Sequence, residues 1–296
     1  EHPVPWQEHS QDIQKLVVEE GVTGIGNESF RNTRNLVSAT FPKSLTRIGD
    51  EAFASCLNLP MVTLPAGVTS IGDYAFSYCG NLALATLPAG LQVIGKGAFD
   101  QCKKLSSVVI PAGVISIGDG AFAGCSSLPT ITVADGNTKY VAVDGVLLNK
   151  EKTQLVQYPA GRAATSYVIP KEVTSIEAGA FEAAEKLTAI TIPVGIVSIG
   201  RMAFESCFAL TTISIPATVK TIGANAFGNC QELAEIKVEA ANTAYTSVDG
   251  VLFDKAKKTL ITYPRGRKTT TYVIPSGVTN IESYAFEYTQ NLTSIT

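Results

Sequence analysis

The feature that constrains this chain most is a 23-residue internal repeat, because a chain with such a period folds by stacking copies of one small unit. The segment LPAGVTSIGDYAFSYC, at 64–79, returns as IPAGVISIGDGAFAGC at 110–125 and as IPATVKTIGANAFGNC at 215–230. A phenylalanine marks each of nine copies, and a leucine follows six residues after it every time. The phenylalanines are Phe30, Phe53, Phe76, Phe99, Phe122, Phe181, Phe204, Phe227 and Phe286.

Each copy reads L-x-x-[AVI]-x-[FILV]-P-x-x-[ILV]-x-x-I-[GE]-x-x-[AS]-F-x-x-C. From the leucine to the proline, apolar and small polar residues alternate, which predicts a short strand with one buried face. The proline cannot donate a hydrogen bond to a ladder, so it ends the strand. We expect V-x-x-I-G to turn the chain and A-F-x-x-C to return it as a short helical turn. One unit cannot bury its own apolar face, so neighbouring coils must stack.

The predicted fold is therefore an α/β solenoid, a right-handed, curved arc with a parallel β-sheet on one face and short helical turns and short strands on the other. Residues 1–12 are an N-terminal leader, and residues 13–296 form a single domain. Eleven strands at a spacing of about 4.8 Å predict an arc roughly 50 Å long. They end at Val18, Phe41, Leu64, Leu87, Ile110, Val133, Ile169, Ile192, Ile215, Val238 and Ile274. Because the sequence starts at Glu1 and stops inside a twelfth strand, we expect the natural N-terminus to have been removed and the natural protein to continue beyond Thr296.

Two coils are longer than the rest, because two of the gaps between phenylalanines are 59 residues instead of 23. These long coils cover about residues 134–168 and 239–273, and they match each other at an offset of 105 residues. In each one, two apolar segments flank a polar connector, NKEKT or DKAKK, which predicts a β-hairpin that stands off the solenoid. An Asp-Gly pair, at 144–145 or 249–250, marks a tight turn before the first hairpin strand.

The repeat, together with the V-D-G-V-L segments of the long coils, resembles the BspA-like, or Treponema-type, class of leucine-rich repeats over residues 13–296. Proteins of that class are mostly secreted or surface-anchored in host-associated bacteria and some protozoa, and some are adhesins that bind host matrix proteins or other cells. The resemblance therefore implies a leucine-rich-repeat solenoid and an extracellular or cell-surface interaction module. The class has no catalytic residues to carry over, and its ligand contacts follow no motif that maps onto this chain.

Composition excludes several functional classes. The net charge of −3 argues against nucleic-acid binding, which uses a clustered basic excess. No apolar run approaches the roughly 18 residues of a transmembrane helix. Histidine occurs only at His2 and His9, so the repeat body lacks the base of Ser-His-Asp and Cys-His catalysis. Carboxylate pairs such as Glu19 and Glu20 are expected in solvent-facing turns. We therefore predict no catalytic residue, no metal site and no cofactor.

The six cysteines share one repeat position, three residues after the phenylalanine. They are Cys56, Cys79, Cys102, Cys125, Cys207 and Cys230. Thr33, Ala184 and Thr289 fill the same position in the other copies, so the position requires a small side chain. Adjacent Cβ atoms in one column lie about 5 Å apart, beyond the roughly 3.5–4.5 Å of a disulfide, and a ladder does not converge on a metal ion. We predict buried, reduced packing cysteines.

A column of solvent-facing strand residues is one candidate binding face, because solenoids commonly bind partners on their concave side. The column comprises Thr40, Thr63, Thr86, Val109, Thr132, Thr191, Ser214 and Lys237. The alternative is that threonine is a β-branched polar residue suited to exposed strand positions. We favour that alternative, since aromatic and arginine side chains dominate interface hot spots and the column has few of them.

The long coils are better candidates for partner binding. They carry corresponding tyrosines, and the second adds a cluster of lysines and arginines, so an aromatic, basic protrusion could engage a sulfated glycan or an acidic matrix protein. Alternatively, the tyrosines only pack the hairpin onto the solenoid and the basic residues are solvated. The candidate partner-binding residues are Tyr140, Tyr158, Arg162, Tyr245, Tyr263, Arg265, Arg267 and Lys268.

These observations favour a non-catalytic, secreted or cell-surface module that adheres to a protein or glycan partner, with host matrix as one candidate ligand. We expect it to be monomeric and to have no nucleic-acid partner. The first alternative is a structural spacer or stalk that presents another domain. The remote alternative is a glycan-active enzyme that uses carboxylates in the turns.

Overall fold

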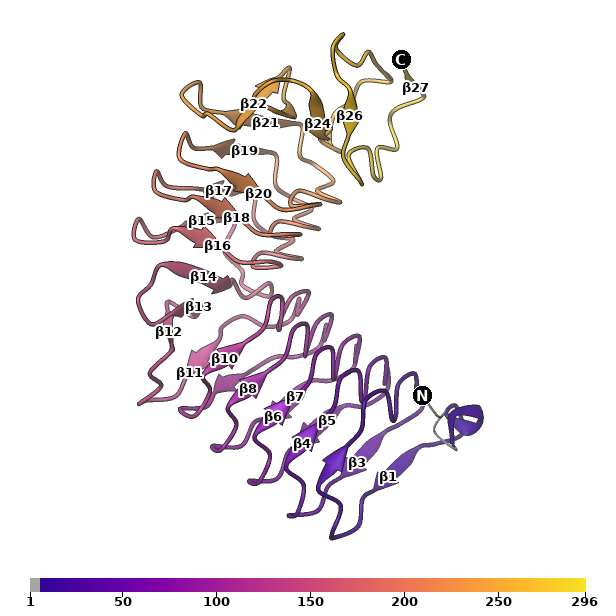
Figure 1. Ribbon diagram of the computed structural model, residues 1–296. Coiled ribbons are helices and arrows are strands. Elements are labelled where there is room, and N and C mark those ends of the chain that lie inside the picture. Colours follow the sequence, from indigo (N-terminus) through magenta and orange to yellow (C-terminus); the bar gives the residue numbers. More distant parts are fainter. Residues whose placement is uncertain (1–5) are drawn as a thin grey trace. The chain divides into compact units, whose positions relative to one another are not determined.

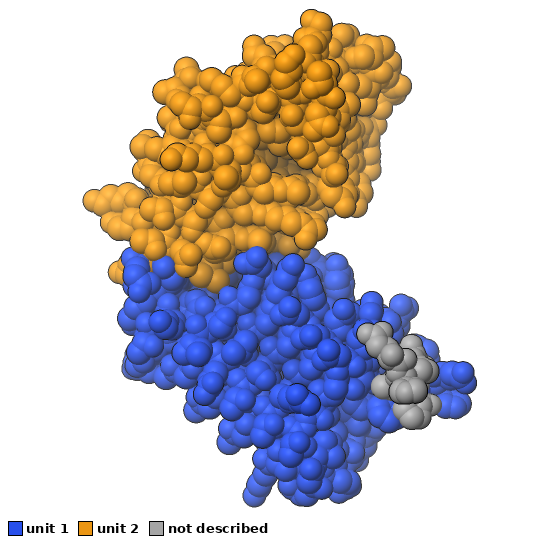
Figure 2. All heavy atoms as spheres, viewed as in Figure 1, with its two compact units in different colours: residues 1–151, 157–162 blue, residues 152–156, 163–296 orange. Residues whose placement is uncertain are grey.

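The computed structural model describes residues 6–296 (Figure 1). By its internal contacts the chain divides into two compact units (Figure 2). Unit 1 comprises Glu1–Glu151 with Gln157–Arg162, and unit 2 comprises Lys152–Val156 with Ala163–Thr296. Within each unit successive coils stack in chain order, as the repeat predicts. The division falls inside the first long coil, so one continuous domain over residues 13–296 stays a prediction.

The first parallel ladder takes one strand from each coil, at the place that the alternating pattern predicts. Paired residues are 23 apart, as Met61 opposite Leu84 shows, and the middle residue of a strand points inward. In unit 1 the strands are β1 (Lys15–Val17), β3 (Ser38–Thr40), β5 (Met61–Thr63), β7 (Leu84–Thr86), β9 (Val109–Ile110) and β11 (Thr132–Val133). In unit 2 they are β15 (Ser166–Val168), β17 (Ala189–Thr191), β19 (Thr212–Ile215), β21 (Glu235–Val238), β25 (Thr271–Tyr272) and β27 (Ser294–Ile295).

A second parallel ladder runs through the V-x-x-I-G segment, which the sequence predicts only as a turn. In most coils its isoleucine points into the core, while the residue before it faces outward. In the last coil Ile281 is 49% exposed. Unit 1 supplies β2 (Gly24–Ile25), β4 (Arg47–Ile48), β6 (Ser70–Ile71), β8 (Val93–Ile94) and β10 (Ser116–Ile117). Unit 2 pairs β16 (Ser175–Ile176) with β18 (Ser198–Ile199) and β20 (Thr221–Ile222), and β26 (Asn280–Ile281) with β24 (Thr259–Thr262). The strand β14 (Gln154–Gln157) pairs with β16.

The predicted helical turn at A-F-x-x-C is wrong, so the α/β description does not hold. Within residues 6–296 helix is limited to the 3-10 turn η1 (Gln7–His9). In all nine coils that carry the repeat phenylalanine, the residues two before and two after it have φ between 52° and 67°. A helix needs φ near about −63° at every residue, so these alternating left-handed positions prevent one.

The left-handed residues direct their N–H groups toward the following coil. The N–H groups of Glu28 and Asn32, for example, donate to the carbonyls of Asp50 and Ala54, both at 2.8 Å. The same bonds recur between the later ordinary coils of each unit. The segment therefore forms a third line of hydrogen bonds between coils. The hydrophobic pattern did not reveal this line, because its side chains follow neither a helical nor a strand period.

The repeat phenylalanines form one stacked column in the core of each unit. In unit 1 the rings from Phe30 to Phe122 stack at centroid distances of 5.3–5.5 Å and interplanar angles up to 16°. In unit 2, Phe181, Phe204 and Phe227 stack at 5.1 and 5.6 Å. Spacing of this size suits parallel aromatic faces. The predicted phenylalanine core is confirmed.

The cysteines lie next to this column, buried and free as predicted. Each thiol donates a hydrogen bond of 3.0–3.3 Å to the carbonyl of the phenylalanine in the preceding coil. Thr33 belongs to the first coil, whereas Ala184 and Thr289 each follow a long coil, which has no repeat phenylalanine. Cysteine therefore occurs only where the coil before it offers such a carbonyl, so small size is not the whole requirement.

The long coils contain the predicted hairpins, but these do not stand off the solenoid. In unit 1, β12 (Tyr140–Val143) pairs with β13 (Val146–Asn149), and in unit 2, β22 (Tyr245–Val248) pairs with β23 (Val251–Asp254), which also pairs with β24. The inner strands β13 and β23 are buried. In unit 2 the place of the repeat phenylalanine is taken by Tyr263, whose N–H donates to the Ala285 carbonyl at 2.8 Å as the phenylalanine N–H does in an ordinary coil. In unit 2 the hairpin predicted around the DKAKK connector is the antiparallel pair β23–β24. The Asp-Gly pair, with φ of 49° and 78°, makes a tight turn just before β13 or β23, as predicted, and joins it to one further strand, β12 or β22.

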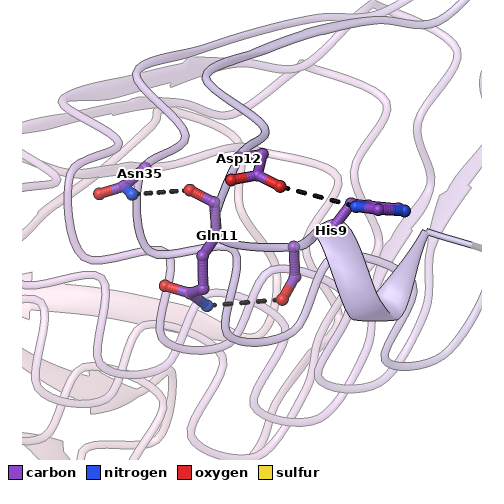
Figure 3. Close-up of polar contacts among 5 residues, drawn as sticks. His9, Gln11, Asp12 and Asn35 are labelled. Atoms are coloured by element: carbon purple, nitrogen blue, oxygen red, sulfur yellow. Dashed lines mark hydrogen bonds and ion pairs between the residues drawn. The ribbon is translucent and has the colours of Figure 1, made fainter.

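Residues of the N-terminal leader contact the first coil of unit 1, and Figure 3 shows the polar contacts. The Trp6 ring stacks on Phe30 at 5.5 Å, and its Nε1–H donates to the Ser29 carbonyl at 2.7 Å. Asn35 donates to the Gln11 carbonyl at 2.7 Å, and His9 lies 3.6 Å from Asp12. Trp6 thus occupies the place that the phenylalanine of a preceding coil would take, which is the role of a solenoid cap.

Candidate partner-binding surfaces

Two of the candidate tyrosines lie in the interior. Tyr158 is 1% exposed and Tyr263 is 3% exposed. In unit 2 the Tyr263 ring stacks on Phe286 at 5.4 Å and meets Tyr272 edge-on at 4.9 Å. In the long coil the tyrosine thus packs on the phenylalanine column, and its ring is not available to a partner.

The other two candidate tyrosines complete the second ladder. The hydroxyl oxygens of Tyr140 and Tyr245 accept hydrogen bonds of 2.8 Å from the backbone N–H groups of Ile117 and Ile222. Ile117 and Ile222 end their ladder strands immediately before a long coil, where the usual carbonyl acceptor is missing. Burial raises the pKa of both phenols above the ordinary value, and the N–H donor lowers it by less.

The three candidate arginines make contacts within their own unit. Arg162 and Arg267 occupy equivalent positions and donate to the backbone carbonyls of Asp144 and Asp249, so each arginine holds a hairpin turn. Arg267 also lies over the Tyr263 ring, 5.4 Å from its centroid. Arg265 donates to Asn229 and lies 5.3 Å from the centroid of Tyr288.

The basic residues of the second long coil do not gather into a protruding patch. Lys268 extends into solvent, 3.9 Å from Glu232. Lys255 and Lys258 donate to the backbone carbonyls of Ala240 and Gly277 at 3.2 Å. Most of the predicted site residues therefore have contacts within the long coil or with a neighbouring coil, and partner binding by them stays a prediction.

The outward face of the first ladder has a different character, because it carries almost no charge. In unit 1 its twelve outward positions include one charged residue, Lys15, and the rest are small polar or apolar. They form two columns: Lys15, Ser38, Met61, Leu84, Ser107 and Thr130, and beside it Val17, Thr40, Thr63, Thr86, Val109 and Thr132. Depletion of charge distinguishes the centre of a protein interface from ordinary surface.

Three large apolar side chains gather on this face of unit 1. Met61 is 50% exposed, Leu84 is 41% exposed and Val109 is 55% exposed. Met61 and Leu84 stand directly opposite each other in the ladder, and Leu84 pairs with Ser107, two residues from Val109. The threonine column that the sequence predicts as a candidate binding face lies next to Met61 and Leu84 but does not include them. Met61 and Leu84 could have been found from the sequence, because each is an apolar residue two positions before an outward-facing threonine and therefore faces outward on the same strand.

The equivalent face of unit 2 is similarly sparse in charge. Its outward positions run from Ser166 on β15 to Thr296 after β27, and their only charged residues are Glu235 and Lys237. These two lie on the same strand and form an ion pair of 2.8 Å. An exposed pair of this kind adds little binding energy, and it leaves the face close to neutral.

The part of the chain that the structure describes contains no metal-binding cluster and no membrane-spanning helix. No group of three or more histidine, cysteine, aspartate or glutamate side chains there could hold a metal ion. In those same residues, no helix has the length and apolar character needed to cross a membrane.

Comparison with protein families assigns the repeat. The model of the BspA type leucine rich repeat region matches residues 8–140, 160–268 and 262–296. None of the curated proteins compared with the chain matches it significantly.

Solved structures of bacterial leucine-rich-repeat proteins share the fold. One from Eubacterium ventriosum is 29% identical with a TM-score of 0.77, over 99% of this chain and 75% of that one. A leucine rich cell surface protein from Faecalibacterium prausnitzii is 27% identical with a TM-score of 0.63, over 96% of this chain and 78% of that one. The pneumococcal vaccine antigen PcpA has a TM-score of 0.68 at 22% identity, over 95% of this chain and 78% of that one, and shows the fold alone.

Proposed function

The chain belongs to the BspA-type leucine-rich-repeat family, and from this membership we propose that it is a non-catalytic adhesion module that binds a partner through the outward face of its first ladder. The single observation that carries the proposal is the near absence of charge on that face. A surface selected only for solubility would be rich in lysine and glutamate. In this chain those residues are placed on the turns and connectors instead.

The apolar group in unit 1 is the proposed centre of the contact. Met61 and Leu84 stand opposite each other on the ladder and Val109 lies on the next strand, and clustered exposed apolar side chains on a soluble protein mark interaction sites. Methionine is enriched at interfaces because its flexible thioether adapts to a partner surface. The surrounding threonines provide hydroxyl groups for hydrogen bonds at the rim.

A secreted or cell-surface location is part of the proposal. The family resemblance supports it, and so does the printed description of the F. prausnitzii relative as a cell surface protein. A host matrix protein or a glycan at another cell surface would be an accessible partner there. Adhesion of this kind uses many modest contacts on a rigid scaffold and requires no catalytic group.

Binding of the chain to immobilised host matrix proteins tests the proposal. We expect micromolar or tighter binding to at least one of them, reduced about tenfold or more in Met61→Lys/Leu84→Lys, because each lysine places a charge at the centre of an apolar contact. Ile115→Lys is the matched control, since Ile115 is an equally exposed apolar residue outside the first ladder, and its binding should stay unchanged.

Two outcomes would contradict the proposal in different ways. Binding that is equally strong in the double variant and the wild type would move the contact away from the first ladder. Absence of any matrix or cell-surface ligand at micromolar concentrations would instead favour a structural spacer.

A further inference from the structure

The left-handed positions that flank the repeat phenylalanine are unfavourable for large side chains. A bulky residue at positive φ is strained, and strain of this kind that persists suggests a function. Most coils place glycine, asparagine, serine or another non-aromatic residue there, but two place tyrosine at both positions. These tyrosines are Tyr74 and Tyr78 in unit 1, and Tyr284 and Tyr288 in unit 2.

In unit 1 the tyrosine pair borders a groove of about 340 Å³ that crosses the Phe30, Phe53 and Phe76 coils. The groove exists because small residues, Ala54, Ser55 and Ser77, lie between bulky neighbours in adjacent coils. Arg31 borders it on one side, and Tyr74 and Tyr78 border it on the other. Backbone bonds from Asn32 to Ala54 and from Ser55 to Ser77 fix this order of coils.

The polar groups around the groove are held in place and balanced in charge. The Arg31 guanidinium contacts the Glu28 carboxylate at 2.9 Å and the Glu51 carboxylate at 3.1 Å. Because Arg31 is already paired, the groove offers no uncompensated positive charge to a phosphate or sulfate group. Its polar lining consists of the Arg31–Glu51 pair with the Asn32 amide and the Ser55 and Ser77 hydroxyls.

The two tyrosines differ in exposure, since Tyr74 is half-buried and Tyr78 is exposed. Tyr74 is fixed as a wall: its ring lies against Gly97, where an added Cβ would come within 2.4 Å of it, and Lys96 lies 5.8 Å from its centroid. Tyr78 is 55% exposed. A tyrosine ring presents an apolar face and a polar edge, so Tyr78 can pack against a ligand that has both characters.

We propose that this groove binds a neutral oligosaccharide, with one sugar ring packed on Tyr78 and its hydroxyls bonded to Asn32, Ser55 and the Arg31–Glu51 pair. A sugar ring has an apolar C–H face and a polar rim, which matches an exposed aromatic ring beside amide, hydroxyl and paired charged groups. A groove of this volume is at the lower end of small-ligand sites. An extended peptide fits less well, because the backbone N–H groups of Phe30, Phe53 and Phe76 are already bonded between coils.

The unit 2 pair is not a second copy of the groove, because Arg265 lies over the Tyr288 ring. Tyr284 is therefore a useful reference: it is 56% exposed, has positive φ and belongs to the same Y-A-F-x-Y motif. Its removal should not affect sugar binding in unit 1.

Isothermal titration of the whole chain with maltotetraose, cellotetraose, mannotetraose and chitotetraose tests the proposal. We expect one of them to bind with a dissociation constant near about 1 mM, as a small, solvent-open site allows. Tyr78→Ala should weaken binding about tenfold or more, and Tyr78→Phe by less than about threefold, because the ring face remains. Ala54→Gln should also weaken it about tenfold by filling the groove, while Tyr284→Ala should change it by less than about twofold.

Three results would overturn the sugar site: no heat with any tetrasaccharide at about ten times the expected constant, equal affinity in Tyr78→Ala and wild type, or binding only of acidic glycans or peptides. Circular dichroism of each variant separates loss of the site from loss of the fold. The inference rests on the proposed adhesive function, but the two fail separately. If the chain binds a matrix protein but no tetrasaccharide, only the sugar-site proposal is rejected. The Met61→Lys/Leu84→Lys variant should still bind the sugar.

Discussion

At the scale of single residues, a position in one coil is determined by what the preceding coil presents to it. The cysteine thiol needs a phenylalanine carbonyl one coil earlier. The glycine of I-G behaves in the same way: a Cβ at Gly95 would lie 2.5 Å from the carbonyl carbon of Gly72, closer than atoms can approach. After each long coil the glycine is replaced, by Glu177 or Glu282. The residue type at the cysteine position and at the glycine position therefore depends on whether the preceding coil is an ordinary coil or a long one.

Removing one thiol should expose this dependence. Cys102→Ala leaves the Phe76 carbonyl without its thiol donor in the core, and we expect it to lower the free energy of unfolding by about 1–3 kcal/mol. Cys102→Ser keeps a donor in the same place and should cost less than Cys102→Ala. Urea denaturation of both variants measures the difference, and a serine variant less stable than the alanine variant would show that the hydrogen bond has no role.

The buried thiols should also make the fold sensitive to alkali. Burial raises the pKa of Cys79, Cys102 and Cys207 well above the ordinary value, so they stay neutral in the folded state. In the unfolded chain they ionise near pH 8.5, so their contribution to stability is complete below that pH and is lost as pH rises above it. Each such thiol should lower the unfolding free energy by up to about 1.4 kcal/mol per pH unit. Urea titrations between about pH 7 and 9.5, before tyrosine ionises, should show a smaller decline for Cys102→Ala than for wild type.

At the scale of elements, each coil is three short segments that bond to the same segments of the next coil. Two are strands, and the third is the left-handed segment around the phenylalanine. Each long coil contains an additional hairpin whose turn is held by Arg162 or Arg267, and in unit 2 Tyr263 bonds to the next coil where an ordinary coil has its phenylalanine. Several of their basic and aromatic residues also contact a neighbouring coil, as Tyr245 does at Ile222, Arg265 at Asn229 and Tyr263 at Phe286.

Contact between coils gives a matched pair of glycine variants. Gly95→Ala should cost about 1–3 kcal/mol, as overpacking does, because its Cβ meets the backbone of the preceding coil. Gly26→Ala should cost less than about 0.5 kcal/mol, since Gly26 lies in the first coil and its Cβ would meet only the Ser29 hydroxyl, at 3.2 Å. Thermal unfolding of the two proteins measures the contrast, and equal melting temperatures would refute the dependence on the neighbouring coil.

The repeat period was enough to predict the stacking, the first ladder, the phenylalanine core and the buried cysteines. It could not predict the left-handed segment, because A-F-x-x-C has the spacing of a helical turn and positive φ leaves no hydrophobic period. The site was harder to predict. Tyr140 and Tyr245 were candidates because aromatic residues in a long loop often bind partners, and the sequence could not show that their hydroxyls accept from Ile117 and Ile222 of the preceding coil. Met61 and Leu84 could be recognised as a candidate contact only from the strand register, which places them opposite each other.

At the scale of the whole molecule, each unit is quasi-one-dimensional, and a coil is stabilised mainly by its immediate neighbours. The ends of such an array are its least stable parts unless they are covered. In unit 1 the Trp6 ring covers the first phenylalanine, and the polar contacts of Gln11 and Asn35 hold the leader in place. Local stability should therefore vary along the chain and should respond locally to change.

Loss of the cap should have such a local effect. Trp6→Ala removes the ring that stacks on Phe30, and we expect faster amide exchange in the Phe30 coil with little change from the Phe181 coil onward. Hydrogen exchange followed by mass spectrometry resolves the two regions. A uniform increase along the whole chain would mean that the solenoid unfolds as one cooperative body.

The thiol-to-carbonyl contact also limits how such a gene can be rearranged. A cysteine coil inserted after a long coil would bury a donor without its phenylalanine acceptor, and an alanine coil inserted after an ordinary one would leave that acceptor without its donor. Recombination that joins coils at random would therefore be selected against, whereas duplication of a whole block, from one long coil to the next, preserves every junction. The 105-residue offset between the two long coils is what such inheritance in blocks would leave behind.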